Sequence, residues 1–162
     1  MTEIVTRCHT GVKLIIIRQG SGIVFFGTYR HNLDPKNRII MPAKFREELG
    51  SSFFVTKGIG DCLWVMPADK WEAFVNQISS RPAPEANALQ HYFFAGADEA
   101  IPNAQGRFVL SEELRAFAGI EKEVTIVGTG KQVEIWSSDN WDKVSKAASQ
   151  QDIAQLMTNI TF

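Results

Sequence analysis

The chain has 162 residues, of which 44% are hydrophobic, and it carries a formal net charge of -1 with a pI near 6.3. This composition supports one ordinary core or two small ones, and it excludes a uniformly basic nucleic-acid-binding domain while allowing a local basic patch. Two cysteines are too few for a disulfide framework, and no apolar run approaches the roughly 20 residues that span a bilayer, so we expect a soluble cytosolic protein.

An internal duplication organises the chain. When the sequence is shifted by 69 residues, and by 70 after a one-residue insertion, nine identical pairs align. The pairs are Phe25/Phe94, Gly27/Gly96, Arg38/Arg107, Arg46/Arg115, Gly50/Gly119, Gly58/Gly128, Gly60/Gly130, Asp69/Asp139 and Trp71/Trp141. Intervening apolar positions agree as well, so we treat the two halves as copies of one unit.

The first copy, residues 24–80, begins with a predicted strand over 25–33 and a turn at Asp34-Pro35. A short strand, "RIIM", leads to a helix that Pro42 opens and Gly50 ends. A β-hairpin with a Gly-x-Gly turn follows over 53–66, and then a helix whose apolar stripe starts at Trp71. We interpret this tryptophan as a core anchor.

Residues 81–92 predict a linker helix between the copies. The second copy, residues 93–146, predicts the same series: a strand over 94–101, a short strand "RFVL", a helix from Ser111 to Gly119, a hairpin with its own Gly-x-Gly turn, and a helix anchored by Trp141. Residues 147–162 predict an amphipathic helix. Its apolar stripe can pack on its own domain or form a subunit contact, and the sequence leaves both open.

These elements predict an α+β fold made of two ββαββα-like repeats, each with two hairpins. Because about 45 residues cannot bury both faces of a sheet alone, we expect the two units to pack about a pseudo-two-fold axis and share one core.

The stretches "FFGTYRHNLDPKNRIIMPAKFREELG" and "FFAGADEAIPNAQGRFVLSEELRAFAG" resemble the MraZ family, whose tandem repeats belong to the AbrB-like swapped-hairpin superfamily. The most specific motif is Asp-x-x-x-Arg, present as Asp34 to Arg38 and, degenerately, as Asn103 to Arg107. Asn37 stands where the family usually has Gly, and Asn tolerates a positive φ best among the other residues.

The resemblance implies a β-barrel-like swapped-hairpin core with flanking helices. It also implies a cytoplasmic, nucleoid-associated transcription regulator that assembles into homo-oligomeric rings. Such a protein binds G-rich direct repeats in double-stranded DNA upstream of its own division and cell-wall gene cluster, which we expect it to repress. Position by position, the resemblance assigns the DNA contact to the turn that carries Lys36 and Arg38.

Local charge favours the first copy as the DNA-binding one. Residues 24–46 hold five basic side chains against Asp34, a balance of +4, whereas residues 93–115 hold two against four acidic ones, a balance of -2. We expect Arg38 to fork two hydrogen bonds to guanine, with Lys36 and Arg30 on phosphates. Asn37 and Arg107 complete the candidate set.

Arg38 has an alternative role, because the same arginine recurs in the acidic copy. It can be structural and pair with Asp34 or with turn carbonyls, and both roles can coexist. Lys44 and Arg46 are expected to be ordinary solvated helix residues.

Catalysis and metal binding have little support in the sequence. The histidines and cysteines show no ligand spacing, and neither a dinucleotide fingerprint nor a phosphate-binding loop occurs. We expect no enzyme activity, no cofactor and no small-molecule substrate; a hydrolase using Cys62 and His91 is the weak alternative. The stronger alternative is a structural ring or an antitoxin-like partner of another protein, without specific DNA binding.

Residues 1–23 have no counterpart in the second copy. Members of the family begin near "MFFG", which aligns with Val24 to Gly27. We therefore hypothesise that Val24 is the natural start and that residues 1–23 are a translated leader. The alternative is a strand, "VKLIII", that joins the sheet.

Overall fold

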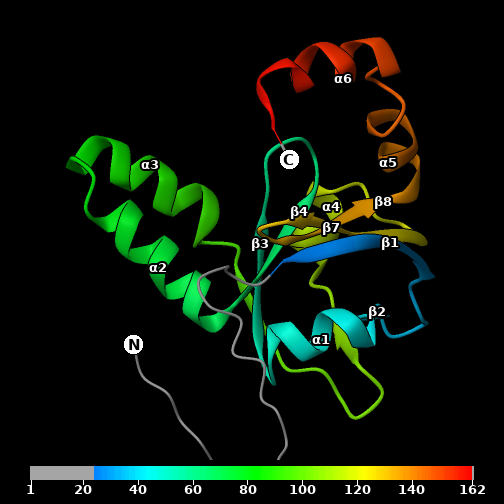
Figure 1. Ribbon diagram of the computed structural model, residues 1–162. Helices are drawn as coiled ribbons and strands as arrows, with labels where there is room; N and C mark the ends of the chain where they lie inside the picture. Colours follow the sequence, from blue (N-terminus) through cyan, green and yellow to red (C-terminus); the bar gives the residue numbers. More distant parts are fainter. Residues whose placement is uncertain (1–23, 162) are drawn as a thin grey trace, which may run out of the picture.

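The computed structural model describes residues 24–161, so both hypotheses about the first 23 residues fall outside the described residues. The first repeat contains β1 (Phe25–Asn32), β2 (Arg38–Ile40), α1 (Ala43–Leu49), β3 (Phe53–Lys57), β4 (Leu63–Pro67), α2 (Ala68–Ser79) and α3 (Ala83–Phe93) (Figure 1). The second contains β5 (Asp98–Ala100), β6 (Arg107–Val109), α4 (Glu112–Phe117), β7 (Glu123–Gly130), β8 (Val133–Ser137), α5 (Ser138–Val144), α6 (Gln150–Leu156) and the 3-10 helix η1 (Met157–Asn159). The α+β class and the ββαββα order of each repeat are confirmed.

The two repeats exchange strands. A six-stranded antiparallel sheet has the order β1-β7-β8-β4-β3-β5, and a separate ladder pairs β2 with β6. The β3–β4 and β7–β8 hairpins are confirmed, but the predicted first hairpin of each repeat is wrong, because β1 pairs with β7 and β5 pairs with β3. The strands β2 and β6 pair with each other instead of with β1 and β5, because this pairing buries their central side chains. Ile39 and Phe108 face each other across the β2–β6 ladder and are only 1% and 3% exposed.

The strand pairings among residues 24–161 form an open six-stranded sheet and a two-stranded ladder, so the swapped-hairpin barrel that the resemblance implies stays an expectation. In them β1 and β5 are the two edges of the large sheet.

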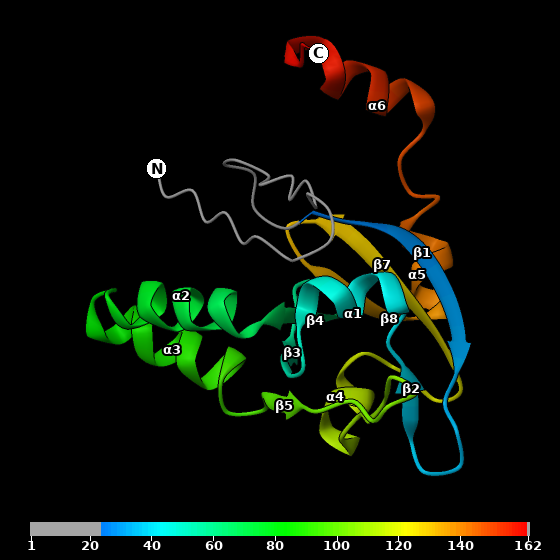
Figure 2. The same cartoon turned by 60° about the horizontal axis from the view of Figure 1, so that its bottom comes forward.

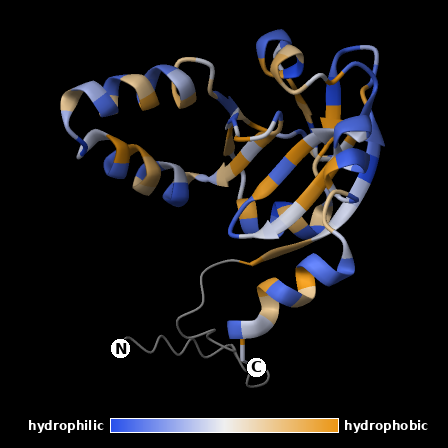
Figure 3. Cartoon of the chain, turned by 90° about the horizontal axis from the view of Figure 1, so that it is seen from above, coloured by the Kyte–Doolittle hydropathy of each residue, from blue (hydrophilic) through white to orange (hydrophobic). Residues whose placement is uncertain are grey.

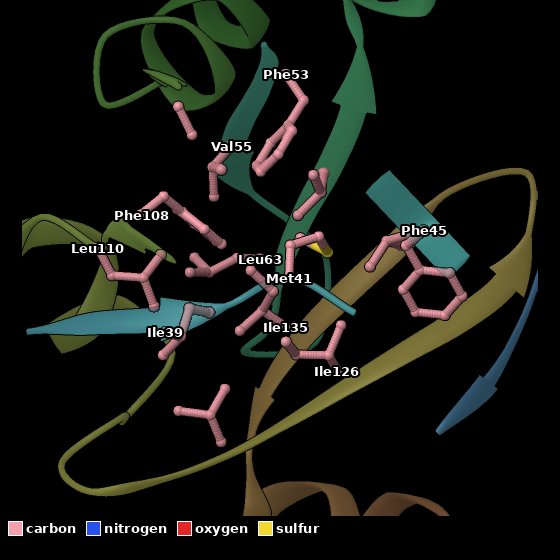
Figure 4. Close-up of a cluster of buried hydrophobic side chains, with 14 of the residues drawn as sticks. Ile39, Met41, Phe45, Phe53, Val55, Leu63, Phe108, Leu110, Ile126 and Ile135 are labelled. Atoms are coloured by element: carbon pink, nitrogen blue, oxygen red, sulfur yellow. The ribbon is translucent and has the colours of Figure 1, made fainter. Parts of the chain in front are cut away.

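One hydrophobic core joins the repeats, as expected. Phe45 packs edge-on against Phe25 and Tyr29, and Phe53 packs edge-on against Phe108 of the other repeat. Figure 4 shows side chains of both repeats converging between the sheet, β2 and α1. Since each fully buried large apolar side chain contributes about 1.5–3 kcal/mol, neither half keeps its stabilisation without the other.

The helical pair α2–α3 contacts β3 and β4 and extends to one side of the sheet (Figure 1). Trp71 stacks on Phe54 with ring centroids 5.0 Å apart, and Phe93 stacks on Trp64 at 5.6 Å. Trp71 is thus a packing residue, as expected, but it is half-buried in an aromatic cluster outside the main core. This packing also keeps Phe93 helical and shortens the strand predicted over 94–101 to β5 alone.

The second Gly-x-Gly segment differs from its prediction. Gly58 and Gly60 lie in the β3–β4 connection as expected, but Gly128 lies inside β7, opposite Gly27 of β1. A Cβ at Gly128 would stand 2.5 Å from the backbone nitrogen of Phe26, so the strands cross too closely for a side chain there. The actual turn holds Gly130, which has a φ of 92°.

The C-terminal helix predicted over 147–162 is shorter than expected, because α6 spans Gln150–Leu156 and is followed by the 3-10 helix η1. Trp141 of α5 packs against Trp136, as an anchor should. The α6 helix instead projects from the body of the molecule (Figure 2). It carries apolar residues (Figure 3), of which Ile153 and Leu156 are exposed. Within residues 24–161, helices long and apolar enough to cross a membrane are absent.

Candidate nucleic-acid interface

A rigid turn connects β1 to β2. The Asn37 N–H donates to the Asp34 carbonyl at 2.9 Å, and the Asp34 N–H donates to the Arg38 carbonyl at 3.0 Å. Pro35 presets the φ of the first central position, and Asn37 adopts a φ of 58°, the positive value that the sequence analysis predicted for it. The tip is therefore held by main-chain bonds at both ends.

The Asp34 carboxylate fills the inside of this turn. Its Oδ1 accepts the backbone N–H groups of Lys36 and Arg38 at 2.8 and 2.9 Å, and its Oδ2 accepts the Arg38 Nε–H at 2.7 Å. The backbone N–H of Arg38 is the main cause that lowers the pKa of Asp34 below its ordinary value, with the Arg38 side chain adding to it. The aspartate is thus ionised and fixes both basic residues in place.

Arg38 has the structural contact that one of its two candidate roles requires. Its side chain is 31% exposed and pairs with Asp34 through Nε. Among the hydrogen bonds found within residues 24–161, none uses the terminal nitrogens of Arg38. The guanidinium group is therefore anchored at one edge and keeps donors at the other.

Lys36 lies at the tip of the turn and is exposed. The ion pairs found within the described range, 24–161, leave its ammonium group without a carboxylate partner. An ammonium held on a fixed turn, with no internal counter-charge, is suited to neutralise a phosphate.

Arg30 is not brought to this surface. It pairs with Asp142 of α5, and that hydrogen bond lowers the pKa of Asp142. Side chains alternate along β1, and Tyr29 packs on Phe45 of α1, so Arg30 points to the face that α5 covers. The turn and Arg30 therefore lie in different surroundings.

The corresponding turn of the second repeat has the same backbone design. Asn103 Oδ1 accepts the N–H groups of Gln105 and Arg107 at 3.0 and 2.9 Å, and Gly106 has a φ of 84°. The Arg107 guanidinium bonds to the Gln105 side chain instead of to a carboxylate.

The two turns lie at opposite ends of the β2–β6 ladder. Arg38 is opposite Val109, and Arg107 is opposite Ile40, two steps along the ladder. Each turn is also tied to the other repeat, because the Leu110 N–H donates to the Asn37 carbonyl and the Met41 N–H donates to the Gly106 carbonyl. The candidate interface is thus part of the exchanged core.

Two residues interpreted as solvated helix positions make specific contacts. Arg46 covers the second turn so closely that a Cβ at Gly106 would stand 2.8 Å from the Arg46 Nε, and this nitrogen is buried without a hydrogen-bond partner. Lys44 holds its ammonium 3.3 Å above the centre of the Phe26 ring. Neither contact could be predicted from the sequence, since neither the spacing nor the sequence neighbours of Lys44 and Arg46 indicate it.

Among residues 24–161, no group of three or more His, Cys, Asp or Glu side chains is placed to hold a metal ion. Cys62 is buried, and desolvation raises the pKa of its thiol to about 12. A thiol with that pKa is protonated at neutral pH, which argues against its use as a nucleophile.

Comparison with known proteins identifies relatives for nearly the whole described chain. The family described as "MraZ protein, putative antitoxin-like" matches twice, over residues 24–91 and 93–160. Proteins named "Transcriptional regulator MraZ" are similar over most of their length. The one from Carboxydothermus hydrogenoformans is 42% identical over 140 residues, 84% of this chain and 98% of the relative. The one from Heliobacterium modesticaldum is 40% identical over 138 residues, which are 83% of this chain and 96% of the relative.

Proposed function

Because the chain belongs to the MraZ family, we propose that it is a sequence-specific DNA-binding transcriptional regulator. It acts without a cofactor in the cytoplasm, at the nucleoid. Its target is a set of G-rich direct repeats upstream of its own division and cell-wall gene cluster, and binding represses that cluster.

The exposed basic tip of the β1–β2 turn is the observation that carries this proposal. Lys36 is exposed at the tip, and the Asp34 carboxylate bonds to the backbone on both sides of Asn37. A turn that is already ordered loses little conformational freedom on binding. Lys36 is therefore assigned to a phosphate, where its contribution depends on salt and not on sequence.

Arg38 is assigned to base reading. Recognition of guanine requires two donors directed at O6 and N7 in the major groove. Asp34 holds the Nε edge of Arg38, which orients the remaining guanidinium donors before DNA arrives. Arg30 is withdrawn from the contact set because it is paired with Asp142 on the α5 side, and Arg107 is assigned to the scaffold of the acidic repeat.

A single turn of this size is a weak DNA-binding element, since it neutralises few phosphates. Several copies that hold their turns in register with direct repeats gain affinity through effective concentration. The functional form is therefore a homo-oligomer, and a closed ring is the arrangement that we propose for it.

Footprinting on the DNA upstream of its own gene tests the proposal. The wild-type protein should protect repeated G-rich sites, and Arg38→Ala should lose this protection while light scattering shows an unchanged assembly. Arg81→Ala is the matched control, because it also removes an arginine paired with a carboxylate four residues away. Protection by Arg38→Ala equal to wild type refutes the assignment of Arg38. A wild-type protein that protects no sequence favours the protein-partner alternative.

A further inference from the structure

The β2–β6 ladder has a buried face and an outward face. Ile39 and Phe108 form its central step and are buried in the shared core. Because side chains alternate along a strand, the steps on either side of this pair direct their side chains to the opposite face. In both Figure 1 and Figure 2, β2 lies away from α2, α3 and α6. The outward face is therefore a small surface to which both repeats contribute.

Arg38 and Val109 share one end of this outward face, and their Cα atoms are partners in the ladder. One step away, the Leu110 N–H donates to the Asn37 carbonyl. Since hydrogen-bonded and non-hydrogen-bonded pairs alternate in an antiparallel ladder, Arg38 and Val109 form a non-hydrogen-bonded pair, in which side chains lie closer together. The Cβ atoms of such a pair are about 4.5–5.5 Å apart. The arginine assigned to guanine thus has an apolar side chain of the second repeat directly beside it.

Val109 is accessible beside that arginine. It is 59% exposed, whereas Ile40, which occupies the corresponding place beside Arg107, is only partly exposed. The Arg38 side chain is 31% exposed and bonds back to Asp34 through Nε, so it lies along the surface instead of extending from it. A single exposed valine is ordinary on a protein surface, but this one adjoins the donors assigned to guanine. The guanidinium group and an apolar group are thus presented together.

We propose that Val109 determines specificity by contacting the 5-methyl group of a thymine next to the guanine that Arg38 binds. Thymine presents this methyl group in the major groove, where apolar side chains contact it, and the groove also admits a two-stranded β-ribbon. Successive bases of one strand rise by about 3.4 Å along the helix axis. A valine whose Cβ is about 5 Å from that of the arginine therefore reaches a neighbouring base. The inference rests on the proposed function, because it requires Arg38 to bind guanine.

This contact gives the second repeat a part in recognition that its charge does not predict. Residues 93–115 have a charge balance of -2, so they add little affinity for phosphate. A methyl contact depends on buried apolar surface and not on charge. Lys36 should therefore raise the affinity for any sequence, whereas Val109 should set the preference for thymine over a base that lacks the methyl group.

Replacement of thymine by deoxyuridine tests the contact, because it removes the methyl group and leaves base pairing unchanged. The probe is the upstream duplex that footprinting protects, with deoxyuridine at the thymines next to the protected guanines, and fluorescence anisotropy follows binding of the full chain. The wild-type protein should bind the deoxyuridine duplex more weakly by about fourfold for each copy engaged, which corresponds to the loss of one buried methyl group. Deoxyuridine at thymines outside the protected sites should have no effect.

Val109→Ala should lose this discrimination. The variant should bind the thymine duplex more weakly than the wild type does, and it should bind the two duplexes equally within about twofold. Val24→Ala is the matched control, since Val24 is 53% exposed and precedes β1, at the opposite end of that strand from the turn. The control should discriminate as the wild type does. Circular dichroism and light scattering should show an unchanged fold and assembly for both variants.

The outcomes separate this contact from the proposed function. Equal binding of both duplexes by the wild type, or a thymine preference retained by Val109→Ala, overturns the role of Val109 and leaves the assignment of Arg38 intact. A protected site with no thymine beside its guanines also overturns it. Loss of assembly in Val109→Ala marks the residue as part of a protein contact and contradicts the proposal. A wild-type protein that binds neither duplex overturns the proposed function, and the inference with it.

Discussion

Arg38 donates two hydrogen bonds to the single carboxylate of Asp34, from its backbone nitrogen at 2.9 Å and from its Nε at 2.7 Å. The first bond is shared with the second repeat, where the Asn103 side chain accepts the Arg107 N–H at 2.9 Å. The second bond has a carboxylate partner only in the first repeat. One acceptor therefore shapes the turn, and its charge orients the arginine.

Substitutions at Asp34 separate these two roles. Asp34→Asn should keep the turn, as Asn103 does, and lose only the ion pair with Arg38. Asp34→Ala also removes the acceptor for the Lys36 and Arg38 N–H groups and should cost about 1–2 kcal/mol more in the free energy of unfolding. Chemical denaturation of the two variants measures the difference. Equal stabilities contradict the assigned role of Oδ1.

Acid should weaken the same contact. The pKa of Asp34 is lower in the folded chain than in the unfolded one, so its stabilisation is fully present above the unfolded value of about 3.9 and is lost as the pH falls from there through the folded value. The carboxyl carbon of Asp34, followed by NMR, should titrate below its ordinary range. The stability gap between wild type and Asp34→Asn should narrow in acid. Titration of Asp34 at or above the ordinary pKa contradicts this account.

Positive φ values predict opposite outcomes for two substitutions. Asn37 has a φ of 58°, so Asn37→Gly should be neutral or slightly stabilising in thermal unfolding. Asn37→Val should cost roughly 1–2 kcal/mol, because a β-branched residue is strained there. If Asn37→Val is as stable as the wild type, the turn does not hold the left-handed conformation in solution.

Gly106→Ala tests the covering of the second turn by Arg46. Gly50 is its matched control, since both glycines have a φ of 84° and a Cβ at Gly50 meets nothing within 4 Å. Gly106→Ala should destabilise the chain more than Gly50→Ala does, because the added methyl group must displace Arg46. If Gly106→Ala and Gly50→Ala change the denaturation midpoint equally, Arg46 does not cover this turn in solution.

Duplication and periodicity predicted much of the fold. The aligned identities predicted the order of elements in both repeats, and the Pro–Gly boundaries of α1 were right, because these signals are local. The conformation of Asn37 was predicted for the same reason: a turn of this type demands a positive φ whatever surrounds it.

Pairing between distant segments could not be predicted in the same way. Both β1 and β2 satisfy the pattern of a local hairpin, and only the packing of Ile39 on Phe108 directs β2 to the other repeat. The contacts of Arg30 with Asp142 and of Arg46 with the second turn also come from the exchanged architecture. The charge of Arg30 was included in the local sum although Asp142 neutralises it. Local charge sums therefore overstate the basic surface of the turn.

The salt dependence of DNA binding by Lys36→Ala tests the central claim most directly. Lys131→Ala, at an exposed lysine in the β7–β8 turn, is the control. On the same upstream duplex, Lys36→Ala should bind more weakly and reduce the slope of log K against log salt by about 0.9 for each copy engaged, whereas Lys131→Ala should match the wild type. An unchanged slope for Lys36→Ala contradicts the assignment of the β1–β2 turn to DNA.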